Sequence, residues 1–113
     1  MPLTQLEAFA LTLAIEALAA FALGRSLKLP PLKCAVAAVA ASTLTHPILW
    51  AVFADAAAFF GTSTTPLLEV AVMAAETPFY RALATARWRD AALLSIVVNA
   101  ASWGAGELIY ALT

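Results

Sequence analysis

Four long apolar runs, separated by short polar stretches, constrain this chain more than any other feature of its sequence. The runs cover residues 3–23, 32–60, 66–86 and 91–112. Each is long enough to cross a lipid bilayer, which takes about 20 apolar residues in a helix. Because lipid offers no hydrogen-bond partners, such a segment must satisfy its own backbone, as a helix does. The sequence therefore predicts an all-α membrane protein.

The connections between the runs are short, and short connections favour antiparallel packing of neighbouring helices. Of the 113 residues, 64% are hydrophobic and only 12% are charged, far from the balance of a soluble domain. We therefore expect one transmembrane domain over residues 1–113, an integral membrane four-helix bundle with the lipid bilayer as its partner.

The basic residues gather at two of these connections, loops 24–31 and 87–90 and their flanks. The positive-inside rule places both loops in the cytoplasm, and with them the N-terminus and the C-terminus outside. The sequence shows no basic aromatic patch suited to nucleic acid, so no nucleic-acid partner is expected. The six basic residues are Arg25, Lys28, Lys33, Arg81, Arg87 and Arg89.

Each apolar run carries one polar residue near its middle, namely Glu16, His46, Glu76 and Asn99. Counting 1.5 Å per residue from the centre of each run puts all of them within roughly 3–4 Å of one depth. A charged side chain at the centre of a bilayer costs about 2.5–3.5 kcal/mol on insertion scales, so such residues usually face the protein interior and mark a pathway or site. We expect them to share one interior pocket.

Other polar residues follow the same helix faces at spacings of three, four or seven. Stripes of small and polar residues mark the faces on which membrane helices approach closely. Asn99 is expected to act as an orienting donor, and Glu69 as an outer relay. The remaining supporting residues are Thr12, Thr45, Ser95, Ser102 and Tyr80.

The chemistry of the predicted pocket is unbalanced, because two carboxylates meet one imidazole with no Lys or Arg at that depth. Either one acid is protonated, or His46 is protonated and paired, or a cation completes the site. Glu16, His46 and Glu76 could also form a three-ligand site for zinc or another divalent cation, although no HExxH spacing is present. A polar cluster that only fixes helix register is the alternative without a function.

Three segments within residues 44–109, LTHPILW, LEVAVMAAETPFYRAL and ALLSIVVNAASWGAGELI, resemble a group of small uncharacterised bacterial membrane proteins. The resemblance implies four helices and a multi-pass location in the bacterial inner membrane, and no activity. In size and in its first-helix glutamate the chain is also similar to small multidrug-resistance exporters, whose sequence motifs it lacks.

The leading hypothesis is a homo-oligomeric membrane protein that binds a proton or cation at Glu16, His46 and Glu76 and couples this to ion or small-solute transport. A homo-oligomer is expected because a few helices enclose only a narrow interior. One alternative is a membrane-embedded enzyme, metal-dependent or acid–base, acting on a lipid-borne substrate, with catalytic residues unknown. Another alternative is an accessory subunit of a larger membrane complex.

Overall fold

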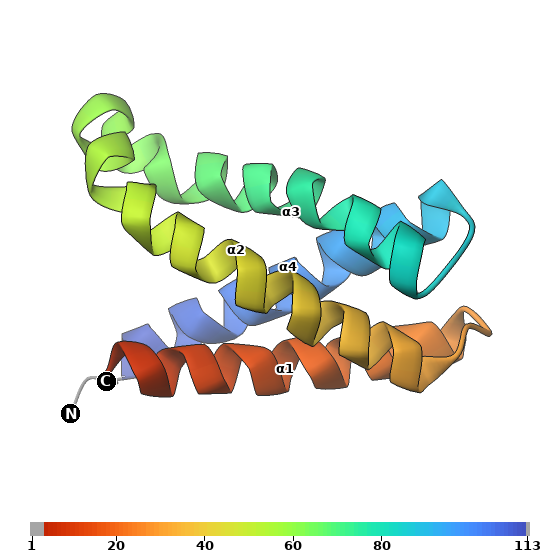
Figure 1. The fold of residues 1–113 in the computed structure, drawn as a ribbon. Coiled ribbons are helices and arrows are strands. Elements are labelled where there is room, and N and C mark those ends of the chain that lie inside the picture. The colour runs from red at the N-terminus through yellow and green to blue at the C-terminus, as the bar shows by residue number, and fades with distance from the viewer. Residues whose placement is uncertain (1–3, 113) are drawn as a thin grey trace.

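The computed structural model describes residues 4–112, which are helical apart from short connections (Figure 1). The helices pack against one another, and each α-helix runs in the opposite direction to the one before it (Figure 1). Their bounds are α1 at Gln5–Ser26, α2 at Pro31–Phe60, a short 3-10 turn η1 at Gly61–Ser63, α3 at Thr64–Leu83 and α4 at Trp88–Leu112.

The start of α1 is defined by a reciprocal pair of side-chain bonds. The Thr4 hydroxyl accepts from the Glu7 amide, and the Glu7 carboxylate accepts from the Thr4 amide, each at 3.1 Å. This capping box satisfies two backbone donors that the first helical turn leaves without partners. At the start of α2, Pro31 occupies a first-turn position where its missing donor costs nothing.

The connection between α2 and α3 is helical rather than a loop. Gly61 has a φ of +60°, which glycine adopts without steric cost, and it turns the chain directly into η1. The Thr64 hydroxyl donates backwards to the carbonyl oxygens of Gly61 and Ala56, at 2.7 and 3.4 Å. The threonines before Pro66 predict a helix N-terminus that is capped by a threonine side chain. In the structure no side chain caps α3.

The predicted integral membrane four-helix bundle is therefore wrong. Within residues 4–112 the chain forms three helical segments rather than four, because α2, η1 and α3 follow one another without an intervening loop. These segments fold into a compact globule with a radius of gyration of 14.0 Å. The predicted placement of both termini outside and of loops 24–31 and 87–90 in the cytoplasm was part of that four-helix fold and is withdrawn with it.

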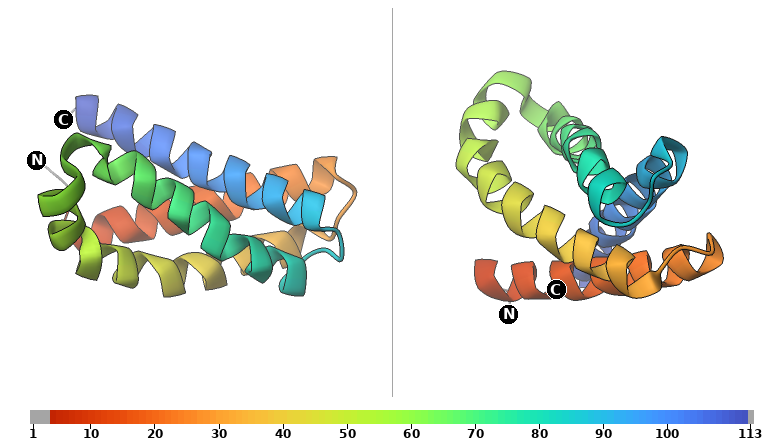
Figure 2. Two further views of the ribbon diagram at one scale, coloured as in Figure 1. Left: turned by 90° about the horizontal axis from the view of Figure 1, so that it is seen from above. Right: turned by 45° about the vertical axis from the view of Figure 1, so that its right-hand side comes forward.

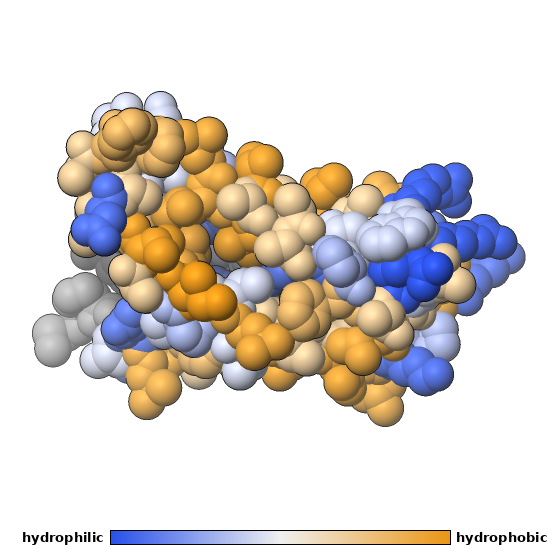
Figure 3. All heavy atoms as spheres, turned by 45° about the horizontal axis from the view of Figure 1, so that its top comes forward, coloured by the Kyte–Doolittle hydropathy of each residue, from blue (hydrophilic) through white to orange (hydrophobic). Residues whose placement is uncertain are grey.

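All three helical segments of the described chain are long and apolar enough to cross a membrane, judged by length and composition. They are Gln5–Ser26, Pro31–Leu83 and Trp88–Leu112. Large apolar side chains cover much of the outside, as the space-filling view shows (Figure 3). Because lipid rather than water suits such a surface, these features indicate membrane association.

The helices are tightly packed at one end of the molecule and spread apart at the other. At the tight end lie the α1–α2 and α3–α4 connections, whereas η1, the start of α1 and the end of α4 lie at the open end (Figures 1 and 2). The core lies toward the tight end. It consists of Ala20, Cys34, Ala37, Ala38, Tyr80, Ala84, Ala91, Leu94 and Val98. Many of these residues are alanines, which allow helices to approach closely.

Gly24 is a point of close approach between α1 and α2. A Cβ atom added there would lie 2.6 Å from the Cys34 Sγ and 3.0 Å from its Cβ. Contacts this short cannot persist, so a side chain at position 24 would push the two helices apart. The absence of a side chain at Gly24 therefore sets the spacing of α1 and α2 at the tight end.

We predict that Gly24→Ala lowers the free energy of unfolding by about 1–3 kcal/mol, the usual cost of overpacking. Gly104→Ala is the matched control, because a Cβ there meets nothing within 4 Å, and the higher helix propensity of alanine should stabilise it by up to about 1 kcal/mol. Unfolding of both variants in detergent micelles measures the difference. Equal stability of the two variants would show that the helices can move apart freely at position 24.

Candidate functional site

Glu16 is fully buried on α1 and faces α2. The Ser42 hydroxyl donates to the Glu16 Oε1 at 2.5 Å, a short, charge-assisted bond. The His46 Nε2 lies 3.7 Å from the same oxygen, which is beyond hydrogen-bond range but close enough for an ion pair once the imidazole is protonated. The other carboxylate oxygen, Oε2, is buried and has no hydrogen-bond partner among residues 4–112.

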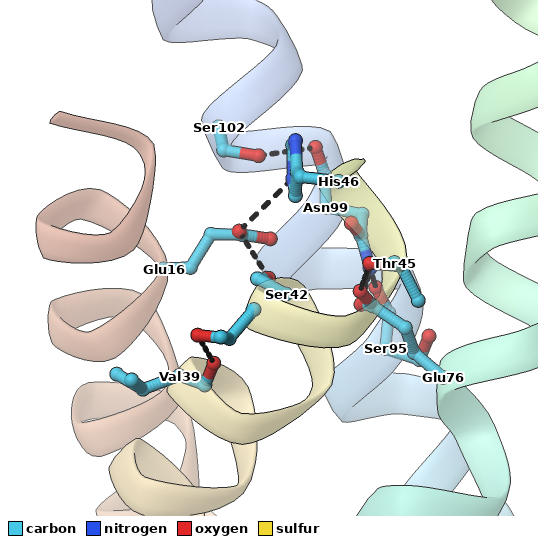
Figure 4. Close-up of polar contacts among 10 residues, drawn as sticks. Glu16, Val39, Ser42, Thr45, His46, Glu76, Ser95, Asn99 and Ser102 are labelled. Atoms are coloured by element: carbon cyan, nitrogen blue, oxygen red, sulfur yellow. Dashed lines mark hydrogen bonds and ion pairs between the residues drawn. The ribbon is translucent and has the colours of Figure 1, made fainter. Parts of the chain in front are cut away.

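The His46 ring contacts two aromatic side chains, those of Phe9 and Trp50. The ring centroids of Phe9 and Trp50 lie 5.9 and 6.1 Å from that of His46. The side chain of His46 is 16% exposed, so the imidazole can exchange protons with its surroundings while it contacts the fully buried Glu16. The His46 and Glu16 side chains approach each other from α2 and α1 (Figure 4).

Glu76 forms a second cluster on the opposite side of α2, and both of its carboxylate oxygens have partners. The Thr45 hydroxyl donates to Oε2 at 2.6 Å, and the Asn99 amide donates to Oε1 at 2.7 Å. Thr45 belongs to α2 and Asn99 to α4, so this carboxylate joins α3 to both of its neighbours (Figure 4). The same Asn99 amide group also donates to the Ser95 carbonyl oxygen at 2.8 Å, which fixes its orientation.

A further bond between α3 and α4 lies one turn from this cluster. The Ser95 hydroxyl donates to the Met73 carbonyl oxygen at 2.6 Å, and the Thr77 hydroxyl donates to the same oxygen at 2.8 Å. Pro78 follows directly and cannot donate a backbone hydrogen bond of its own. Hydroxyl donors thus gather on the backbone near this proline, as is common in membrane helices.

A cavity of about 190 Å³ opens between the helices at the loosely packed end. We call it the acidic mouth, because its lining includes the carboxylates of Glu69 and Glu107. Every α-helix contributes at least one residue to it. Its lining residues are Thr12, His46, Glu69, Ser102, Trp103, Gly106 and Glu107. His46 therefore belongs both to the acidic mouth and to the Glu16 cluster.

The structure divides the predicted shared pocket into two neighbouring clusters. Glu16 and His46 lie together, whereas Glu76 binds Thr45 and Asn99 instead. Within the described residues, no group of three or more His, Cys, Asp and Glu side chains is arranged to hold a metal ion. The proposed three-ligand divalent cation site at Glu16, His46 and Glu76 has no support from this geometry.

The supporting residues fall into three places. Thr12, Glu69 and Ser102 line the acidic mouth, whereas Thr45 and Ser95 form bonds between helices. Ser102 also donates to the Asn99 carbonyl oxygen at 3.2 Å. Tyr80 instead lies in the tightly packed core, where its side chain is fully buried and its hydroxyl has no partner among residues 4–112.

Three residues that the structure places around the site were not among the predicted site residues. Ser42 binds Glu16 directly, and its position one turn before His46 on the same helix face was the available signal. Trp103 and Glu107 line the acidic mouth, and the Trp103 indole donates to the Glu107 Oε1 at 3.3 Å. Their spacing of four residues on α4 is a regular helix-surface pair, but it does not indicate a cavity.

No family model, curated protein or solved structure matches this chain. The geometry of the site itself is therefore the basis on which a function can be assigned.

We predict that Asn99→Leu lowers the free energy of unfolding by about 1–3 kcal/mol. Leucine keeps most of the volume but donates nothing to Glu76, and an unsatisfied buried acceptor costs roughly this amount. Ser102→Ala is the control, because its hydroxyl binds only a carbonyl within its own helix, and its effect should stay below about 0.5 kcal/mol. Equal losses in a detergent unfolding assay would contradict the role assigned to the Glu76–Asn99 bond.

Proposed function

We propose that this chain is a multi-pass protein of the bacterial inner membrane that takes up a proton or small cation at Glu16 and His46. Uptake is coupled to the movement of an ion or small solute. The observation that carries the proposal is the environment of Glu16, a fully buried carboxylate with one unpartnered oxygen and with an imidazole 3.7 Å away. A buried ionisable group in an apolar segment costs free energy, so such a group usually marks a pathway or a site.

The route to Glu16 runs through the acidic mouth. Glu69 and Glu107 line the cavity and attract cations, and His46 belongs to the same lining. A proton that reaches His46 creates an imidazolium next to the Glu16 carboxylate, and transfer to Glu16 then neutralises both groups. His46 acts as the relay and Glu16 as the acceptor.

Glu76 has a different role in this proposal, because both of its oxygens are already bonded. Its bonds to Thr45 and Asn99 connect α3 to α2 and α4. Protonation of Glu76 would replace an acceptor oxygen by a donor and so weaken one of these bonds. Glu76 therefore links the local charge to helix packing, the kind of coupling that a transporter requires.

We further propose that the functional unit is a homo-oligomer. A groove of about 330 Å³ runs along α1 and α2 on the outside of the molecule. Most of its lining residues are small, and small residues favour close helix packing in membranes. Its lining consists of Ala17, Ala35, Val36, Val39 and Ala40.

Glu16→Gln should reduce proton-driven or cation-driven flux in reconstituted vesicles at least tenfold, because glutamine cannot accept and release a proton at this position. Asp55→Asn is the control, since Asp55 is an exposed acid on α2 outside the site, and its flux should match that of the parent protein. Flux that is unchanged in Glu16→Gln would contradict the proposal. A parent protein without flux that co-purifies with other membrane proteins would favour the accessory-subunit alternative.

Replacing both acids of the mouth, in Glu69→Gln with Glu107→Gln, should slow uptake severalfold at low ionic strength. The carboxylates raise the local concentration of cations, and salt screens that attraction. The difference from the parent protein should therefore shrink when flux is measured in roughly 0.5 M salt, where the screening length is only a few ångströms. An equal loss at both salt concentrations would show that the two acids act in some other way.

A further inference from the structure

A second cavity, of about 480 Å³, lies at the tightly packed end of the molecule, whereas the acidic mouth lies at the open end. It is formed where the α1–α2 connection meets the α3–α4 connection, by residues 27–29, residues 84–87 and Asp90. All six basic residues of the chain lie at or near these two connections. We call this space the basic-end cavity; hydrophilic side chains gather around this end in Figure 3, on the right.

The basic-end cavity contains groups that suit a phosphate. Lys28 and Arg87 are exposed cations in its lining, one from each connection. The buried Thr85 hydroxyl accepts the Arg87 amide at 3.2 Å, and its own proton can be donated to a further oxygen. Two cations and a hydroxyl from facing segments form an arrangement that recognises phosphate oxygens.

Asp90 supplies the opposite charge in the same cavity. Its side chain is nine-tenths or more buried, and its Oδ1 has no hydrogen-bond donor among the described residues. The nearest cation is the Arg89 guanidinium at 3.6 Å, on a side chain that is 77% exposed. Because the Arg89 guanidinium is largely exposed, solvent screens this ion pair, and the buried Asp90 carboxylate remains available for a stronger donor. A bare phosphate would be repelled by this carboxylate.

A ligand with both charges satisfies every one of these groups. We propose that the basic-end cavity binds the zwitterionic headgroup of an aminophospholipid, with its phosphate at Lys28, Arg87 and Thr85 and its primary ammonium group at Asp90. A bare metal ion would leave most of a 480 Å³ space unfilled. An anionic phospholipid without an amine would leave Asp90 unpaired.

The position of the cavity along the molecule agrees with a lipid source. The helix α1 has 22 residues, which makes it about 33 Å long at 1.5 Å per residue. The hydrocarbon core of a bilayer is roughly 30 Å thick. If α1 crosses that core, the connection that follows it lies at the level of the headgroups. Basic pockets at this level of membrane proteins are known to hold lipid headgroups.

The test is a lipid titration of the purified full chain in a detergent without phosphate groups, followed by native mass spectrometry. Phosphatidylethanolamine should bind at least fivefold more tightly than phosphatidylglycerol of the same acyl chains. In Asp90→Asn this preference should fall to near one, because the amide cannot pair with an ammonium group. In Lys28→Asn both lipids should bind at least fivefold more weakly; asparagine tolerates the φ of +61° found at position 28.

Lys33→Gln is the matched control, because Lys33 is a basic residue of the same end outside the cavity lining. It should change neither affinity by more than twofold. Equal binding of the two lipids by the parent chain, or an unchanged preference in Asp90→Asn, would overturn the proposal. Neither result bears on flux through the Glu16 site, so the two proposals fail separately.

A series of lipids with increasingly methylated headgroups, bound to the parent chain, tests the role of Asp90 even if Asp90→Asn does not fold. Affinity should fall stepwise from phosphatidylethanolamine through its monomethyl and dimethyl forms to phosphatidylcholine, as the ammonium loses its N–H donors. A flat series would exclude recognition of the ammonium by Asp90.

Soluble phosphoethanolamine and inorganic phosphate, added as competitors, distinguish a lipid from a free ligand. Displacement of the lipid at millimolar phosphoethanolamine would show that the free zwitterion is a sufficient ligand and overturn the lipid assignment.

Discussion

Two buried carboxylates, bonded only by neutral donors, tie the helices of this protein together. Glu16 accepts from Ser42 and so joins α1 to α2, whereas Glu76 accepts from Thr45 and Asn99 and so joins α2, α3 and α4. In lipid the hydrophobic effect does little to hold one helix against another, so hydrogen bonds and close packing have a larger share. Hydroxyls and amides carry no formal charge, whereas His46, 3.7 Å from Glu16, brings a positive charge to it once the imidazole is protonated. Any change in the charge of the acids therefore acts directly on the contacts between helices.

The two ends of the molecule differ in how closely the helices pack. At the tight end, alanines, Gly24 and Cys34 bring the backbones close together and leave little freedom for movement. At the open end the helices spread apart and enclose the acidic mouth, with His46 in its lining. The Glu16 cluster lies where these two regions meet. A rigid half next to a looser half is an arrangement in which a local charge can change helix positions at one end alone.

Part of the site could be predicted from the sequence because depth along a helix follows from counting residues. The middle positions of the apolar runs identified Glu16, His46, Glu76 and Asn99, and Glu16, Glu76 and Asn99 are buried in the structure. Their partners could not be predicted in this way. Helical periodicity reports which face of a helix is polar, but the rotation of one helix against the next decides which donor reaches which carboxylate. This is why one expected pocket became two clusters on either side of α2.

The sequence alone determined that the chain is helical, apolar over long segments, and polar at a few interior positions, because composition and residue spacing act locally. The tertiary structure decided how those segments are joined and paired. At Gly61 a left-handed backbone and the backward bonds of the Thr64 hydroxyl continue the helical path through the turn, so three segments form where four were expected. The same packing brought residues 27–29 against residues 84–87 and placed Asp90 beside them. Contacts between residues so far apart in the chain depend on the geometry of helix crossing, which local sequence patterns do not record.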